Sequence, residues 1–174
     1  MREIIPTRLW IGNATDARNV TGVLGLGIAA VVDLAIEEPP IQFPRDVVYC
    51  RFPLIDGVGN QPAVLRVAID TVAYFIASRT PMLVACGAGM SRSPAIVAAA
   101  MATTKRIALA DVLEKLTAGQ PHDVSPGLLA EISDILTRIG PIADRWRAWP
   151  MRTSKIAALL IVAGLGRWAS AETV

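Results

Sequence analysis

Short apolar runs alternate with longer segments of helical periodicity along most of the chain. A run in which nearly every position is apolar is typical of a strand buried on both faces, and apolar residues three or four positions apart are typical of a helix with one covered face. The pattern predicts strands over residues 9–11, 28–34, 47–52 and 82–85, and helices over residues 15–24, 62–78, 94–104, 109–117 and 126–139. This alternation predicts an α/β fold, a single domain with a mainly parallel central sheet flanked by helices.

The length of the chain fits one such domain and a tail. A chain of 174 residues can bury one core well and is too short for two comfortable domains. We expect the domain to span residues 1–145 and an apolar tail flanked by tryptophans and arginines to span residues 146–174. The apolar run at residues 156–166 is shorter than the roughly 20 residues that cross a bilayer, so packing on the domain or on a partner is favoured over membrane contact.

Charge and cysteine content narrow the classes of function. The formal net charge is +2, and without a run of lysines or arginines nucleic-acid binding is not expected. Two cysteines do not suggest a disulfide framework. The first residues also lack the apolar core of a signal peptide, so the expected location is the cytoplasm.

The segment between the predicted strand at residues 82–85 and the helix that follows carries the clearest chemistry. Cys86 and Arg92 stand at its two ends, and two glycines between them allow tight turns that aim successive amides at one point. We expect Pro94 at the first helical position and Ser93 as the N-cap, so the helix start adds positive charge there. Such a loop favours a thiolate and binds an oxyanion, two of whose oxygens the arginine can hold.

Cys86, five intervening residues, Arg92 and Ser93 resemble the signature of the cysteine-dependent protein tyrosine phosphatases, and residues 89–93 (Gly-Met-Ser-Arg-Ser) resemble the dual-specificity branch. The resemblance covers most of residues 4–140 and includes, in kind and order, residues 5–13, 28–34 and 49–56. It implies hydrolysis of phosphate monoesters through a cysteinyl-phosphate, with a phosphorylated protein as substrate and no metal or other cofactor. Phosphotyrosine is the first candidate group, and phosphoserine and phosphothreonine are further options.

The resemblance also implies a role for each site residue. Cys86 would be the nucleophile, Arg92 would compensate charge on the transferred group, and Ser93 would donate a hydrogen bond to the leaving sulfur. Asp56, before Gly57, would act as general acid and then as general base, although an aspartate before a glycine is also an ordinary turn residue. The phosphate would be held by Gly87, Ala88, Gly89, Met90, Ser91 and Arg92.

One departure from the family keeps alternatives open. Ala85 stands where the family usually has a histidine before the nucleophile, so we expect a slower enzyme. A phosphate-binding module without turnover is the alternative from another class, and a phosphatase for a small-molecule or RNA 5′-phosphate is the alternative among enzymes. The uncharged interior of the loop disfavours an inositol lipid as substrate.

Other candidate residues have simpler interpretations. Cys50 is expected to be a buried core thiol, with a redox partnership with Cys86 as the alternative. His122, the single histidine, is expected to be exposed and not catalytic. Asp33 and Asp46 are expected to be structural or solvated.

Overall fold

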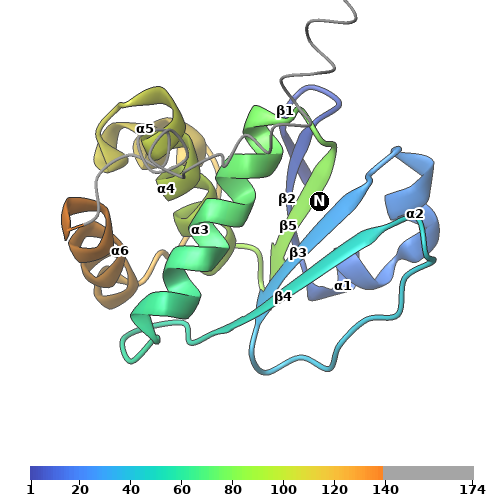
Figure 1. Cartoon of the computed structure of the whole chain (residues 1–174), viewed down its shortest axis with the longest axis horizontal. Helices are drawn as coiled ribbons and strands as arrows, with labels where there is room; N and C mark the ends of the chain where they lie inside the picture. Colours follow the sequence, from blue (N-terminus) through green and yellow to red (C-terminus); the bar gives the residue numbers. More distant parts are fainter. Residues whose placement is uncertain (139–174) are drawn as a thin grey trace, which may run out of the picture. The chain divides into compact units, whose positions relative to one another are not determined.

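The structure is a computed structural model that describes residues 1–138, and its described part is a sheet between two helical layers (Figure 1). The strands are β1 (Arg2–Ile5), β2 (Leu9–Asn13), β3 (Ala30–Ala35), β4 (Val48–Leu54) and β5 (Met82–Cys86). The helices are α1 (Ala14–Arg18), α2 (Val20–Gly25), α3 (Pro62–Ala77), α4 (Arg92–Lys105), α5 (Leu109–Thr117) and α6 (Pro126–Arg138).

The strand order β1-β2-β5-β3-β4 places β5 at the centre of the sheet. The pairings of β2 with β5, β5 with β3 and β3 with β4 are all parallel, and β1 alone pairs antiparallel, at an edge. The prediction of an α/β fold with a mainly parallel sheet is therefore confirmed. Cys86 is the last residue of β5 and lies opposite Asn13 of β2, so the loop that follows it leaves the carboxyl edge of the sheet, where α/β folds place their ligands.

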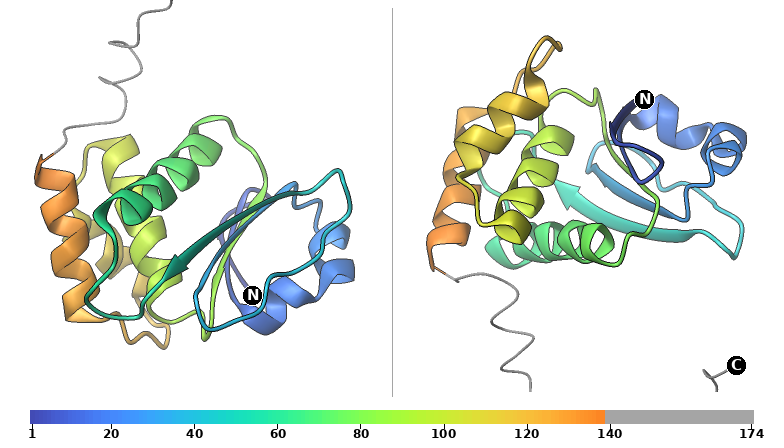
Figure 2. Two further views of the ribbon diagram at one scale, coloured as in Figure 1. Left: turned by 60° about the horizontal axis from the view of Figure 1, so that its bottom comes forward. Right: turned by 90° about the horizontal axis from the view of Figure 1, so that it is seen from above.

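The two faces of the sheet carry separate cores. Helices α3, α4, α5 and α6 cover one face, and α1 and α2 cover the other (Figures 1 and 2). Because successive side chains of a strand point to opposite faces, Val32 and Val84 join the larger core with Ile69 of α3 and Ile96 of α4. Trp10, Val31 and Leu83 join the smaller core with Ala17 and Val23.

Helix α4 is the centre of the larger layer, and nine consecutive residues from Arg92 to Ala100 are buried. A helix that is buried all round reads as apolar on every side, which explains the run of alanines and valines in this segment. The small alanine side chains allow α3 and α5 to pack closely on either side. The start of this helix, and with it the loop between β5 and α4, is consequently fixed by the core.

Two predicted helix boundaries were wrong. The helix expected over residues 15–24 is broken at Asn19, which ends α1 and whose side chain accepts a hydrogen bond from Gly22 N at the start of α2. The helix expected to begin at Pro94 begins at Arg92, with Ser91 as its N-cap residue, so Ser93 lies inside the first turn. Proline is tolerated anywhere in the first turn, and for that reason it did not mark the first helical position.

Strand β1 was not predicted, because Arg2-Glu3-Ile4-Ile5 lacks the longer apolar run that marks a buried strand. An edge strand with one neighbour does not need such a run. The predictions for the tail, including the apolar run at residues 156–166, and the predicted end of the last helix at residue 139 lie outside the described residues. Within residues 1–138, none of the helices combines the length and apolar composition needed to cross a membrane.

Candidate active site

The loop between β5 and α4 curls around the sulfur of Cys86. Cys86 is 1% exposed, and its Sγ accepts a hydrogen bond from the amide of Gly89 at 3.3 Å. The loop therefore presents the Gly89 amide to the Cys86 sulfur.

Contacts from both sides of the sheet edge hold this loop. On one side, the amide of Ala14 donates to Gly87 O at 3.1 Å, and on the other, the amide of Asp123 donates to Met90 O at 3.1 Å. Gly89 has a φ of 75° and lies so close to β2 that a Cβ would be 2.9 Å from Gly12 O. Glycine is required at position 89 for both reasons.

Arg92 and Ser93, the first two residues of α4, are buried with hydrogen-bonding capacity to spare. The Arg92 side chain is 4% exposed and Ser93 is 0% exposed. Arg92 Nε and Ser93 Oγ have no hydrogen-bond partner among the described residues. Because a buried unpaired polar group costs about 1–3 kcal/mol, two such donors beside a cysteine loop indicate a site arranged for an anion that supplies the missing acceptors.

The other two nitrogens of Arg92 both donate hydrogen bonds. Nη1 donates to Glu37 Oε2 at 2.6 Å and to Leu54 O at 3.0 Å, and Nη2 donates to Glu37 Oε1. This bidentate pair raises the pKa of Arg92 above its usual value and holds the pKa of the Glu37 carboxyl below its usual range, since each charge stabilises the other.

Asp56 lies across the loop from the start of α4. Its Oδ1 accepts a hydrogen bond from Ser91 Oγ at 2.5 Å, and its Oδ2 lies 3.7 Å from Arg92 Nε. The side chain is 44% exposed, so the carboxyl group has access to both solvent and the loop. The structure thus brings Asp56 next to Ser91 and Arg92, although Asp56 is 35 positions before Ser91 in the chain.

The loop that carries Asp56 is itself anchored. Asn60 accepts a hydrogen bond from Ile55 N at 2.8 Å and donates to Gly57 O at 3.0 Å, which closes the turn around Asp56. Glu131 of α6 accepts from Gly59 N at 2.7 Å and from Asn60 Nδ2 at 3.0 Å. Asp56 is therefore positioned by a helix that begins 70 residues later in the chain.

Cys50 and Asp33 have structural roles. Cys50 of β4 is opposite Val32 of β3, which is opposite Val84 of β5; the two intervening strand spacings are about 4.8 Å each, beyond the reach of a disulfide with Cys86. Cys50 is a free, half-buried thiol that packs against the larger core, and burial raises its pKa. Asp33 is buried and accepts a hydrogen bond from Tyr49 OH at 2.6 Å.

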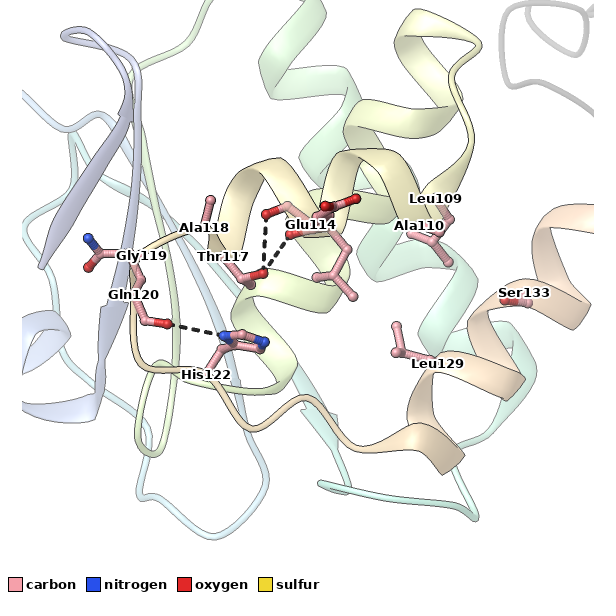
Figure 3. A pocket seen from close by; sticks show the side chains of 11 residues that line it. Leu109, Ala110, Glu114, Thr117, Ala118, Gly119, Gln120, His122, Leu129 and Ser133 are labelled. Atoms are coloured by element: carbon pink, nitrogen blue, oxygen red, sulfur yellow. Dashed lines mark hydrogen bonds between the residues drawn. The ribbon is translucent and has the colours of Figure 1, made fainter.

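A groove lies apart from the cysteine loop. It has a volume of about 820 Å³ and lies between α5, the segment after it and α6 (Figure 3). Its lining includes Leu109, Leu113, His122 and, from α6, Leu129. His122 is exposed, as expected, and its Nδ1 lies 3.1 Å from Gln120 O. No candidate catalytic residue lines this groove. Among the described residues, no three His, Cys, Asp or Glu side chains are arranged to hold a metal ion.

Three residues of the site were not predicted from the sequence: Glu37, Asn60 and Glu131. Each is an acidic or amide residue, and the neighbourhoods of Glu37 and Glu131 along the chain do not distinguish them from solvated side chains. Their partners lie 55 positions away for Glu37 and 71 or 72 for Glu131. Only the Asn60 bonds to Ile55 and Gly57 are local, and a turn-closing asparagine is a signal that could have been recognised.

The sheet order, the central cysteine loop and the helix behind it define the class: the chain has the fold of the dual-specificity phosphatases. Human DUSP28 is similar with a TM-score of 0.67 and 21% identity, over 78% of this chain and 94% of that one. DUSP15 is similar with a TM-score of 0.59 and 22% identity, over 80% of this chain and 97% of that one. A human tyrosine phosphatase-like serine/threonine/tyrosine-interacting protein is similar with a TM-score of 0.65 and 20% identity, over 77% of this chain and 93% of that one.

No family model and no curated protein matches the sequence. The resemblance noted in the sequence is thus confirmed at the level of the fold, which is what likeness at these identities establishes.

Proposed function

We propose that the chain is a phosphatase that hydrolyses phosphate monoesters on proteins, phosphotyrosine first, through a cysteinyl-phosphate on Cys86. The observation that carries this proposal is the pair of buried donors without a hydrogen-bond partner among the described residues, Arg92 Nε and Ser93 Oγ, next to the loop whose Gly89 amide donates to the Cys86 sulfur. The amides of Gly87, Ala88, Gly89, Met90 and Ser91, with the guanidinium of Arg92, are assigned to the phosphate oxygens.

In the first step the Cys86 thiolate attacks phosphorus and the bond from phosphorus to the ester oxygen breaks. Asp56, in its acid form, gives its proton to the departing oxygen, so the leaving group departs as a neutral alcohol or phenol. The negative charge that moves onto the phosphoryl oxygens is met by the loop amides and by Arg92, which are fixed before the substrate arrives.

In the second step a water molecule attacks phosphorus and the phosphorus–sulfur bond breaks. Asp56, now a carboxylate, takes the proton of the water, and inorganic phosphate is released. The electron pair of the broken bond returns to Cys86 as a thiolate. Ser93 Oγ, which has no other partner among the described residues, supplies a hydrogen bond to that sulfur.

The residues around the site favour an apolar group next to the phosphate. Four exposed apolar side chains belong to the loops that carry Glu37, Asp56 and Cys86, namely Ile36, Ile55, Val58 and Met90. Residues 35–44, 55–60 and 87–91 contain no lysine or arginine. An aromatic ring suits such a rim better than a polyphosphorylated headgroup, and this supports phosphotyrosine over an inositol lipid.

The test compares the wild-type protein with Cys86→Ser, Asp56→Asn and, as a matched control, Cys50→Ser. We expect Cys86→Ser to lower kcat/KM on p-nitrophenyl phosphate and on a phosphotyrosine peptide by about a thousandfold or more. Asp56→Asn should lower it by about a hundredfold on the peptide, and Cys50→Ser should leave it unchanged. Acid quenching during turnover should trap one phosphoryl group on the peptide that contains Cys86.

Each contrary outcome has a defined meaning. A wild-type protein no faster than Cys86→Ser would overturn the enzyme, and binding of the phosphopeptide by both would then identify a phosphate-binding module, which Ala85 keeps open. Full activity of Asp56→Asn on the peptide would show that a residue other than Asp56 is the general acid. Faster hydrolysis of a small-molecule or RNA 5′-phosphate than of any phosphopeptide would overturn the proposed substrate class while leaving the chemistry in place.

A further inference from the structure

Residues 119–125, between α5 and α6, lie directly against the cysteine loop and add a negative charge there. The amide of Asp123 donates to Met90 O at 3.1 Å, and the amide of Ser125 donates to Ser91 Oγ at 3.3 Å. Asp123 is exposed, and its carboxylate has no ion pair or hydrogen bond within the described part of the chain. Because a carboxylate is only a few ångströms from the amide of its own residue, this charge lies within a Debye length, about 8 Å, of Met90 O.

Carboxylates outnumber cations around the site. Glu37 and Asp56 share the single guanidinium of Arg92. Glu131, which anchors the loop of Asp56, accepts hydrogen bonds from amide nitrogens and from no lysine or arginine in residues 1–138. With Asp123, four carboxylates therefore surround the site for one guanidinium.

The basic side chains nearest to this group are already paired. Arg18 of α1 pairs with Glu38, and Arg51 Nε of β4 lies 3.7 Å from Asp33 Oδ2. The carboxylate of Asp16 is matched by the amino group of the first residue. The segments that contact or form the cysteine loop contain no other lysine or arginine before the helix begins, namely residues 35–44, 55–60, 87–91 and 119–125. The excess of negative charge around the site is thus not balanced from nearby.

The site is nevertheless built to bind an anion. Arg92 Nε and Ser93 Oγ are buried without a hydrogen-bond partner among the described residues, and the start of α4 adds positive charge beside them. The positive charge is confined to these buried groups, whereas the side chains of Glu37 and Asp56 are 47% and 44% exposed. A phosphate group is attracted by the buried donors, and negative charge next to it on the same substrate is repelled by the exposed carboxylates.

We infer that the protein substrate carries lysine or arginine next to its phosphorylated residue, and that Asp123 is a specificity-determining residue for these cations. This assignment rests on the proposed function and names the sequence around the phosphotyrosine. A basic neighbour reduces the repulsion between the substrate and the exposed carboxylates, while an acidic neighbour or a second phosphate increases it. Exposed charge pairs are individually weak and are screened by salt, so the preference is moderate and depends on ionic strength.

Asp123 can be changed without removing its contact with the cysteine loop, because that contact uses the backbone amide. Asp46 is the matched control for a change of charge. It is exposed and lies two positions before β4 begins. Since β4, β3 and β5 run parallel, Asp46 is at the amino edge of the sheet, opposite the edge from which the cysteine loop leaves.

The experiment measures kcat/KM for three phosphotyrosine peptides of equal length, whose residues on both sides of the phosphotyrosine are lysine, glutamine or glutamate. At low ionic strength we expect the lysine peptide to exceed the glutamine peptide by about fivefold and the glutamate peptide by about twentyfold. Raising the salt concentration to about 0.5 M should reduce both ratios to about twofold, because the Debye length then falls to about 4 Å.

The variants locate the preference on the surface. Asp123→Lys should lower the ratio of the lysine to the glutamate peptide by about fivefold, and Asp123→Asn by a smaller factor. The rate on p-nitrophenyl phosphate, which has no flanking residues, should stay within about twofold of the wild type. Asp46→Lys changes the net charge equally and should leave the ratio unchanged. Thermal unfolding identifies a variant that fails to fold, and Asp123→Asn, which keeps the size of the side chain, then carries the test.

Equal kcat/KM for the three peptides, or a preference for glutamate, would overturn the inference. An unchanged ratio in Asp123→Lys would do the same, as would an equal change in Asp46→Lys, which would assign the effect to net charge alone. If the wild type hydrolyses none of the peptides, the proposed function fails instead. Calorimetric binding of the same three peptides then still decides whether basic neighbours are favoured.

Discussion

Gly87 and Gly89 serve different purposes within the same loop. Gly89 has a positive φ and lies against the backbone of β2, whereas Gly87 leaves room for the carboxylate of Glu37. The expectation that both glycines serve the turn was therefore right only for Gly89. A glycine in a binding loop can be required by its own backbone or by a neighbour's side chain, and these two cases predict different effects of a substitution.

Gly89→Ala should abolish phosphate binding. The new Cβ would be 2.9 Å from Gly12 O, and the residue would keep a φ near 75°, so the loop must shift and its amide can no longer donate to Cys86 Sγ. We expect kcat/KM to fall by about a hundredfold or more. Steady-state kinetics and thermal unfolding measure the two effects separately.

Gly119→Ala is the control for this change. Gly119 has a φ of 68°, and a Cβ there would meet no atom within 4 Å, so it carries similar backbone strain without the collision. It should lower stability by about 1 kcal/mol and leave kcat/KM unchanged. An equal loss of activity in both variants would refute the role assigned to the contact between Gly89 and β2.

Ala85 lies next to the nucleophile but faces away from the larger core. It is 1% exposed, packs in the smaller core with Trp10 and Leu83, and is opposite Asp33 of β3. A side chain at this position reaches the loop only from the face covered by α1 and α2. The expected loss of rate from the missing histidine thus remains a prediction about support of the loop.

At the scale of elements, α6 acts on the candidate acid through one residue. Glu131 accepts hydrogen bonds from Gly59 N and from both nitrogens of Asn60. Asn60 in turn closes the loop around Asp56 by bonding both the amide and the carbonyl of Ile55. The position of Asp56 consequently depends on how α6 packs, and α6 packs through Leu128, Ile132 and Ile135 in the larger core.

Glu131→Gln should slow the enzyme most when the leaving group is poor. Loosening the loop displaces Asp56, and a proton from Asp56 is needed more for phenyl phosphate than for p-nitrophenyl phosphate, whose leaving group is already stabilised. We expect kcat/KM to fall by about tenfold on phenyl phosphate and by a smaller factor on p-nitrophenyl phosphate.

Asp134→Asn is the matched control, because Asp134 is on the same helix and pairs only locally with Arg138 among the described residues. It should change neither substrate's rate. Equal losses on the two phosphate esters in Glu131→Gln would contradict the link to proton transfer and would point to binding instead.

At the scale of the whole molecule, one polar cluster stabilises the sheet and responds to pH. Tyr49 OH donates to Asp33 Oδ2 and accepts from Ile41 N, so it joins β4, β3 and the segment that connects them. Burial and the nearby Asp33 raise the pKa of Tyr49 from 10.0 to about 12. The neutral phenol is thus the form that the folded protein favours.

The sign of the pH effect follows from this shift. A pKa that is higher in the folded state gives stability that is fully present below pH 10 and is lost as the pH rises towards 12. Tyr49→Phe should lower the free energy of unfolding by about 1 kcal/mol at pH 7, and its difference from the wild type should shrink above pH 10. Urea unfolding across this range measures it, with the exposed Tyr74→Phe as control; a constant difference would contradict the assignment.

The order of the elements and the position of Cys86 between a strand and a helix could be predicted, because each depends on a few neighbouring residues. Each of the four predicted strands is a short apolar run, and the loop from Cys86 to Arg92 joins the last of them to a helix, whatever the rest of the chain does. The start of that helix was misplaced by two residues because Ser91, whose hydroxyl bonds Asp56 instead of capping, has no local mark of its role.

By itself, then, the sequence determined the α/β alternation and the cysteine loop, since propensity, apolar period and motif spacing act over a few residues, and the family resemblance indicated Asp56 as the candidate acid. The tertiary structure decided that β5 is central, that Glu37 pairs with Arg92, and that Glu131 anchors the loop of Asp56. These contacts join segments 55 to 72 positions apart, and no local pattern records which distant segments the packing of the core brings together.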